Sequence, residues 1–208
     1  MLVEAPSVNF KSIERFYKDR SEKYGWSFKG AGWSSPIEQS ERFRALSNML
    51  PFGEYSLNDY GCGSGGLLDF LSSCHKLPSV YHGIDTCISQ IKRLQIRLDR
   101  YKLDGHAMVS SHPITKTDFT VASGTFNVML GNTEKYWEEY VEDRIAMMDI
   151  YSSSGFGFNL LSGEVGVGLY RSTPGRWIEL CEKLGGCTLL SYPPGNFTIL
   201  VRKRRVKK

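Results

Sequence analysis

Residues 57–67 read LNDYGCGSGGL, so a short apolar run leads through Asp59 into glycines at alternate positions. Apolar residues follow directly at Leu67 and Leu68. This order predicts a strand, a tight turn and a helix. Glycine has no Cβ, so the chain can turn sharply there and a ligand can lie against bare backbone. The unpaired N–H groups at the start of the helix would face that ligand. Open α/β sheets bind nucleotide-like molecules at such a turn.

The chain has 208 residues, of which 41% are hydrophobic, enough for the core of one domain. We expect a helical cap over residues 1–53, an α/β core over 54–203 and a basic tail over 204–208. No run of about 18 apolar residues is present, so no membrane span is expected. Residues 1–11 lack the basic-then-apolar order of a secretory signal. The sequence therefore predicts a cytoplasmic protein.

The net charge of +4 is concentrated at one end of the chain. Residues 202–208 carry six cations, and without them the net charge is −2. The body therefore gives little electrostatic support for a nucleic-acid partner. The tail can contact nucleic acid, but a solvated, frayed terminus is the simpler interpretation.

The five cysteines are an odd number and contain no CxxC pair, which predicts free thiols in a reducing compartment. The four histidines do not cluster with the cysteines at ligand spacing. No metal site is predicted.

Strands and helices alternate from about residue 55 onward. We expect strands at residues 55–60, 80–85, 107–110, 119–122 and 155–161, and helices at about 67–74, 88–101, 134–151 and 174–184. Two further strands, 187–192 and 197–201, flank a Pro-Pro-Gly-Asn turn, which is typical of an antiparallel hairpin. This alternation predicts an α/β fold with a mostly parallel sheet and helices on both faces.

The region before the sheet is expected to contain two helices with an aromatic stretch between them. Residues 10–25 have helical periodicity, and Ser35 and Pro36 are typical of the start of a second helix that ends near residue 50. The intervening residues 24–36 are rich in glycine yet contain two tryptophans. A polar loop seldom exposes that much aromatic surface without a partner.

Two acids accompany the glycine turn. Asp85 ends the second expected strand, about twenty residues after the turn, where an acid can accept both hydroxyls of a ribose. It can also cap the following helix. Asp59 can accept backbone N–H groups of the turn, or reach a cationic or amino part of the ligand.

The glycines by themselves fit two patterns. Gly61, Gly63 and Gly66 fit the GxGxxG form of dinucleotide-binding proteins. Gly61, Gly63 and Gly65, taken with Asp59, fit the form D/E-x-G-x-G-x-G. The second form resembles the first motif of class I S-adenosylmethionine-dependent methyltransferases.

Further segments resemble the same family. Residues 83–85 (GID) resemble its second motif, residues 118–127 its strand and loop that face the methyl donor, and the closing hairpin its antiparallel seventh strand. Together they cover about residues 56–203. Shorter motifs resemble small bacterial methyltransferases of surface-glycan or natural-product biosynthesis: Phe16-Tyr17, Tyr24-Gly25, Gly32-Trp33, Gln39-x-x-Arg42-Phe43 and residues 157–161. The resemblance implies a Rossmann-like seven-stranded sheet, its last strand antiparallel, with an N-terminal helical and aromatic cap.

The resemblance also implies that S-adenosyl-L-methionine is the cofactor. Asp85 would bind its ribose, Arg42 its carboxylate, and the glycine turn its methionine part. Aromatic faces of the cap would cover the sulfonium cation. The complete predicted set is Asp59, Gly61, Cys62, Gly63 and Gly65 at the turn, Asp85, Thr86 and Cys87 beside the ribose and adenine, Ser123 and Gly124 beside the sulfonium, Arg42 at the carboxylate, and Tyr17, Tyr24 and Trp33 in a lid. Alternatively, Arg42 pairs with Glu38 and Tyr17 only packs the cap.

One segment departs from the family pattern. The family often has an acid just after the third strand that contacts the adenine amino group, whereas residues 109–113 here read VSSHP. A serine hydroxyl or a backbone carbonyl would have to replace it. His112 and Tyr24 are candidate bases and Asn127 a candidate orienting group, and the sequence assigns none of them.

The expected activity is methyl transfer to a hydroxyl, amine or carboxyl group of a small molecule in a biosynthetic pathway. A dinucleotide-dependent oxidoreductase is one alternative, although the chain after Asp85 is short for a second mononucleotide-binding half. A non-catalytic module that binds S-adenosylmethionine is another.

Overall fold

The computed structural model describes residues 8–164, 167–191 and 194–203, and within them eight strands form one sheet. The strands are β1 (Ser56–Tyr60), β2 (Val80–Asp85), β3 (Asp104–Val109), β4 (Thr117–Ala122), β5 (Ser152–Ser162), β6 (Arg171–Ser172), β7 (Gly186–Leu190) and β8 (Asn196–Arg202). The helices are α1 (Phe10–Tyr24), α2 (Pro36–Ser47), α3 (Gly66–Ser73), α4 (Ile88–Tyr101), α5 (Glu134–Ile150) and α6 (Pro174–Glu182).

The sheet order is β3-β2-β1-β4-β5-β8-β7, with β6 paired to β5. Neighbours from β3 to β5 are parallel, whereas β8 runs antiparallel to both β5 and β7. The predicted mostly parallel sheet with an antiparallel last strand is therefore confirmed. The additional strand β6 was not expected, because two residues are too few to show a periodicity.

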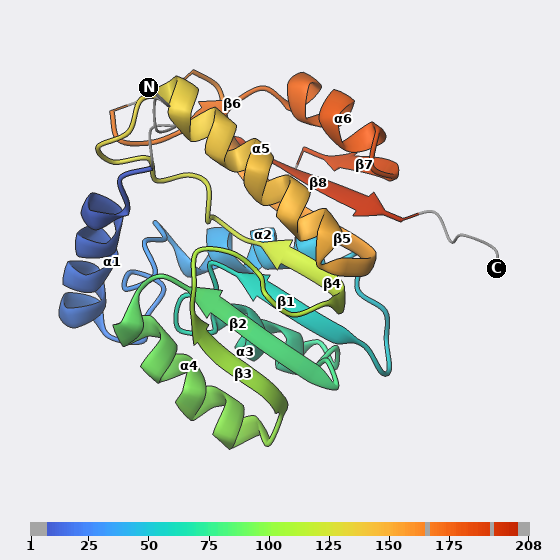
Figure 1. Cartoon of the computed structure of the whole chain (residues 1–208). Helices are drawn as coiled ribbons and strands as arrows, with labels where there is room; N and C mark the ends of the chain where they lie inside the picture. The colour runs from blue at the N-terminus through green and yellow to red at the C-terminus, as the bar shows by residue number, and fades with distance from the viewer. Residues whose placement is uncertain (1–7, 165–166, 192–193, 204–208) are drawn as a thin grey trace, which may run out of the picture.

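Helices cover both faces of the sheet, as Figure 1 shows with α5 in front of the strands and α2 and α3 behind them. One core contains Trp137 of α5 and Trp177 of α6. The other contains Phe43 of α2, Leu68 of α3 and Leu94 of α4. Each helix buries one apolar stripe against the strands, which is the usual solution for an α/β fold. No described helix is long and apolar enough to cross a membrane.

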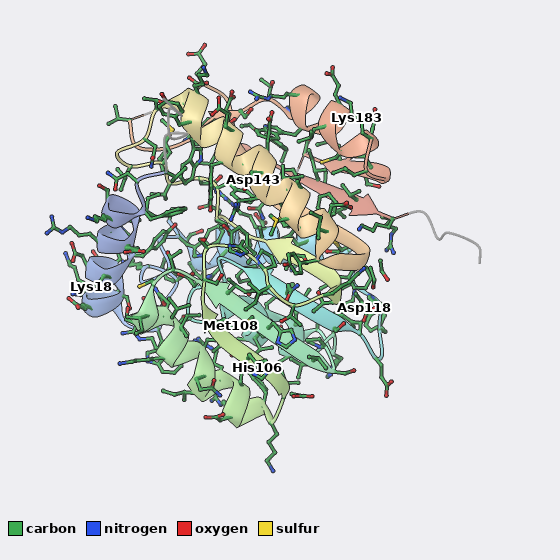
Figure 2. The ribbon with its side chains drawn as sticks, viewed as in Figure 1. Lys18, His106, Met108, Asp118, Asp143 and Lys183 are labelled. Carbon is green, nitrogen blue, oxygen red and sulfur yellow. The ribbon has the colours of Figure 1, made fainter. Side chains whose placement is uncertain are left out.

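The carboxyl ends of β1, β2 and β4 point toward α1, which stands beside that edge of the sheet (Figure 1). In Figure 2, Lys18 of α1 and Asp118 of β4 mark the two opposite ends of the strands. The cap and the glycine turn therefore meet at one end of the sheet, where parallel strands place their ligands.

The basic end of the chain begins inside the fold. Arg202 donates a hydrogen bond to the carbonyl of Met49 (3.1 Å), and the Lys203 ammonium lies 3.0 Å from the Asp149 carboxylate. These two cations are not the solvated terminus that the sequence suggested, because β8 carries them onto the body of the protein. Residues 204–208, the expected tail, lie outside the described residues.

The described part of the chain contains neither a disulfide nor a metal cluster. All five cysteines are free, three of them buried. No group of three or more histidine, cysteine or acidic side chains is arranged to hold a metal ion among the described residues.

Gly83 of β2 has a packing role that can be tested. A Cβ built at Gly83 would overlap the Cδ2 of Leu94, which is fully buried in the core. We expect Gly83→Ala to lower the free energy of unfolding by about 1–3 kcal/mol in urea denaturation, because the core must shift to admit the methyl group. Gly175→Ala is the matched control, since its Cβ would meet no atom within 4 Å. Equal stability of the two variants would contradict this account.

Candidate functional site

A cavity of about 480 Å³ lies at the carboxyl ends of the parallel strands. Its walls come from α1, the loop over residues 25–34, α2, the β1–α3 turn, the end of β2 and the β4–α5 loop. The structure brings these predicted residues together around it: Tyr17, Trp33, Arg42, Asp59, Gly61, Cys62, Gly63, Asp85, Thr86, Ser123 and Gly124. Gly65, Tyr24 and Cys87 are not among its lining residues.

Asp85 joins the end of β2 to the glycine turn. One carboxylate oxygen accepts a hydrogen bond from the Gly63 N–H (2.9 Å), and the other accepts from the Cys87 N–H (2.8 Å). Burial raises the pKa of Asp85, and these backbone donors oppose the rise. Cys87, not Asp85, is the N-cap residue of α4. Each carboxylate oxygen can accept a further hydrogen bond, so the group remains available to a ligand hydroxyl.

The three alternate glycines of the turn serve different purposes. A Cβ on Gly61 would overlap the Thr125 side chain, and one on Gly65 would lie 2.7 Å from Leu94 Cδ1. A Cβ on Gly63 would meet nothing within 4 Å, although the residue has φ +53°. Of the three, only Gly63 presents open backbone to the cavity. Gly65 instead allows close packing of α3 against α4, which explains its absence from the lining.

Asp59 lies buried at the end of β1 and lines the cavity. Its carboxylate accepts a hydrogen bond from the hydroxyl of Tyr81. Burial raises the pKa of Asp59 to about 7, with a smaller rise from Asp85 and an opposing effect of the Tyr81 hydrogen bond. The expectation that Asp59 orients the turn is not met for Gly61 and Cys62, since their N–H groups donate to the Ile84 carbonyl.

Trp33 connects the cap to the sheet. Its ring lies against Gly124, where an added Cβ would come within 2.9 Å of the indole. It packs edge-on against Phe43 (centroids 6.1 Å apart), and the Arg42 guanidinium lies 4.8 Å from the ring centroid of Trp33. The Trp33 side chain therefore forms the part of the cavity wall that lies against the β4–α5 loop.

The two predicted lid tyrosines have different positions. Tyr17 lines the cavity and packs on Gly32. Burial and then the nearby Asp85 carboxylate raise the pKa of Tyr17. Tyr24 instead lies among the cations of Arg20, Lys23 and Lys29, at 5.2–6.0 Å from its ring centroid. Its place in a lid is a correction to the sequence prediction, because the last residue of α1 is turned toward these cations.

Arg42 pairs with Glu38, as one of the two sequence interpretations expects, and its contact with a cofactor carboxylate stays a prediction. It forms an ion pair with Glu38 through Nη2, and it also lines the cavity. The residue is only 2% exposed, and its Nε and Nη1 have no hydrogen-bond partner in the described structure. A buried donor without an acceptor is costly, more so when it is charged. The arrangement indicates a ligand acceptor at Nε and Nη1.

Sequence reasoning missed the residues of α4 that hold the aromatic loop. Gln90 donates to the Gly30 carbonyl (3.3 Å), and Arg93 donates to the Gly25 carbonyl (2.7 Å). The Arg97 guanidinium lies 4.7 Å from the ring centroid of Trp26, another lining residue. The spacing of these three residues places them along one stripe of α4, and this spacing is the signal in the sequence that could have indicated a shared contact.

Neither candidate base lines the cavity. His112 lies beyond β3 with its Nδ1 3.3 Å from the Ser111 hydroxyl, and Tyr24 lies outside as described above. Asn127 does line the cavity. Ser110, where the family often has an acid, also lines it, so a serine hydroxyl is present on the adenine side that the resemblance implies.

Comparisons with known proteins identify the family. No family model matches the chain. The Mycobacterium tuberculosis protein Rv1506c, which carries the name of a methyltransferase, is 31% identical over 157 residues, covering 72% of this chain and 93% of the relative. The chain belongs to the class I S-adenosylmethionine-dependent methyltransferases. Because the chain belongs to this family, a dinucleotide-dependent oxidoreductase is no longer the alternative function to consider.

Solved structures share the fold at low sequence identity. The magnesium protoporphyrin IX methyltransferase of Synechocystis with bound S-adenosylhomocysteine has a TM-score of 0.65 at 11% identity, covering 94% of this chain and all of that one. The 1,6-didemethyltoxoflavin N1-methyltransferase of Burkholderia thailandensis has a TM-score of 0.63 at 13% identity, covering 97% and 93%. The two enzymes have unrelated acceptors, so the fold does not identify the acceptor.

The contact of Trp33 with Gly124 can be tested by a pair of alanine variants. Gly124 (φ +73°) and Gly195 (φ +74°) have nearly the same positive φ, but a Cβ would meet Trp33 at Gly124 and no atom within 4 Å at Gly195. We expect Gly124→Ala to lower the free energy of unfolding by about 1 kcal/mol more than Gly195→Ala does, since the two residues have similar φ and only Gly124 has a neighbour that must move. Hydrogen exchange should also become faster in residues 25–34 of Gly124→Ala alone. Unchanged exchange there would contradict the packing described for Trp33.

Proposed function

We propose that this methyltransferase binds S-adenosyl-L-methionine in the 480 Å³ cavity and transfers its methyl group to a small molecule. The observation that carries the proposal is the placement of Asp85 and the unpartnered Arg42 nitrogens around one cavity, with the open backbone of Gly63 beside Asp85. A carboxylate suits a ribose diol, and a guanidinium suits a carboxylate.

Different lining residues suit different parts of the cofactor. Asp85 would accept the ribose hydroxyls, with Thr86 and Ser110 near the adenine. The methionine part would pass over Gly63, where no side chain intervenes, and its carboxylate would take up Nε and Nη1 of Arg42. Asp59 would attract the amino group.

The cap supports a small acceptor. Side chains of α4 donate hydrogen bonds to the loop over residues 25–34, and Trp33 of this loop packs against Gly124 of the β4–α5 loop. An acceptor therefore has to fit beneath residues 25–34. Without residues 202–208 the net charge is −2, which gives little overall electrostatic support for a nucleic-acid acceptor. A hydroxyl, amine or carboxyl group on a biosynthetic intermediate is the acceptor we propose, in the cytoplasm.

Bound S-adenosylmethionine supplies a methyl group on a positively charged sulfur, which is already activated for displacement. The residues of this chain then have to align the acceptor with that methyl group and exclude water. Such alignment is worth roughly 7–11 kcal/mol in favourable cases. The acceptor's lone pair forms the new bond to carbon, and the carbon–sulfur bond breaks. A carboxylate acceptor has no proton to lose, and a hydroxyl or amine acceptor releases its proton to the bulk solvent after methyl transfer; neither His112 nor Tyr24 lines the cavity.

Turnover distinguishes this function from a non-catalytic binding module. The purified protein is incubated with methyl-labelled S-adenosylmethionine and pools of small biosynthetic intermediates, and labelled products are identified by mass spectrometry. A labelled product supports the proposal. Binding of S-adenosylhomocysteine in calorimetry without transfer to any acceptor would favour the module. Absence of heat with both cofactor forms would overturn the proposal.

Asp85 is the residue whose replacement tests the cofactor site most directly. We expect Asp85→Ala to weaken binding of S-adenosylhomocysteine by about 1–3 kcal/mol, the range for lost hydrogen bonds to a charged group. Isothermal titration calorimetry gives the dissociation constant, and a thermal melt checks the fold. Asp69→Ala is a lining-residue control, because that carboxylate pairs with Arg97. Unchanged affinity in a folded Asp85→Ala protein would remove the ribose assignment.

Asp59 makes the affinity depend on pH. Its pKa of about 7 means that the carboxylate becomes protonated, and loses its attraction for a cation, as the pH falls below 7. We expect the affinity for S-adenosylmethionine to fall on acidification, by at most about tenfold per pH unit. Asp59→Asn should bind more weakly at pH 8 and flatten this dependence. Calorimetry between pH 5.5 and 8.5 measures both effects, and a profile unaltered by the substitution would contradict the role of Asp59.

A further inference from the structure

Arg171 is the first residue of β6, and it lines one end of the cavity. β4 pairs with β5 as far as Ala122, opposite Phe158, and β6 pairs with β5 from Leu161 onward. The other side of Leu161 is occupied by β8. The short strand β6 therefore continues the sheet beyond the carboxyl end of β4, next to the β4–α5 loop. This placement puts Arg171 in the wall of the cavity.

No carboxylate of the described residues neutralises Arg171. Its Nη1 donates to the Ser162 carbonyl (3.1 Å), and the described ion pairs do not include it. It is also close enough to Arg42 to affect it: burial lowers the pKa of Arg42, Glu38 opposes this, and Arg171 lowers it further. Three arginines thus line one cavity: Arg42 pairs with Glu38 and Arg97 pairs with Asp69, whereas Arg171 is in none of the described ion pairs. Such a site favours an anion.

Asn127 provides a second polar group beside Arg171. Its side-chain oxygen accepts a hydrogen bond from the Leu161 N–H (3.1 Å), which fixes the amide so that its nitrogen is the available donor. Both Asn127 and Leu161 line the cavity. Apolar lining residues come from α1, the β4–α5 loop, α5, β5 and the segment before β6: Phe10, Ile13, Val128, Trp137, Leu161 and Leu169.

We propose that the methyl acceptor is a small, mainly apolar molecule with an anionic group, which Arg171 binds and the Asn127 amide orients. The proposal rests on the proposed function, because the cofactor has to occupy the part of the cavity between Asp85 and Arg42. An apolar body suits the Val128, Leu161 and Leu169 side chains, and the anionic group offsets the charge that no described acid neutralises. Arg171 is thus a residue for acceptor specificity, and Arg42 a residue for the cofactor.

The competing assignment is that both arginines bind the cofactor carboxylate. Calorimetry with S-adenosylhomocysteine distinguishes the two. We expect Arg42→Met to weaken this ligand by at least about tenfold, the effect of losing a hydrogen bond to a charged group, and Arg171→Met to leave it within about twofold. Binding of 5′-methylthioadenosine, which has no carboxylate, should be unaffected in both variants. Equal weakening of S-adenosylhomocysteine in both would assign Arg171 to the cofactor and overturn the proposal.

The acceptor part is tested with simple probes in the protein saturated with S-adenosylhomocysteine. Ligand-observed NMR follows benzoate, phenyl phosphate and the neutral benzamide. We expect the two anions to bind at millimolar concentration and better than benzamide. Arg171→Met should weaken the anions at least about tenfold, whereas Arg171→Lys should retain part of the affinity.

Arg176→Met is the control, because Arg176 is paired with Glu138 and Glu142 and does not line the cavity. Thermal melts exclude unfolding of each variant. Failure of both anions to bind the loaded wild-type protein, or binding that Arg171→Met leaves unchanged, would overturn the anion site while leaving the proposed function intact. Failure of S-adenosylhomocysteine to bind at all would instead overturn the proposed function.

Discussion

The hydrogen bonds of the Asp85 carboxylate hold the site together. They join the end of β2, the start of α4 and the turn at Gly63. The N–H groups at Gly61 and Cys62 add a second connection through the Ile84 carbonyl. Because backbone N–H groups bind the half-buried Asp85 carboxylate, the open face of Gly63 is fixed before any ligand arrives. Ligand binding therefore does not have to order this turn.

Arginine side chains hold the irregular part of the cap, the loop over residues 25–34. Arg93 and Arg97 of α4 reach the loop over residues 25–34, and Arg42 lies beneath Trp33. Arg42 keeps two buried nitrogens without an acceptor, which destabilises the free protein and favours the bound state. In the function we propose, a ligand carboxylate at these two nitrogens would remove that cost. The cap is the part of the molecule where we expect ligand to add the most stability.

One end of the cavity is formed by β6, which pairs with the part of β5 that extends beyond β4. The additional length carries β6, and with it Arg171, over the carboxyl end of β4. The Asn127 side chain bonds to the same stretch of β5, so the two polar groups are held on one rigid edge. Class I methyltransferases with the same sheet act on unrelated acceptors, and a difference in this edge is a simple way to change the acceptor without altering the cofactor site.

The sequence alone determined the order of the strands and helices, the glycine turn and the acid at the end of β2, because these depend on local periodicity and on residues that few other conformations can use. Ser35 as N-cap of α2 was likewise predictable, and its hydroxyl accepts from the Glu38 N–H. Only the tertiary structure decided that Gly65 packs against Leu94, that Tyr24 turns away from the cavity and that Arg171 enters it. Those outcomes depend on contacts between segments that are far apart in the sequence. A local sequence pattern does not contain such contacts.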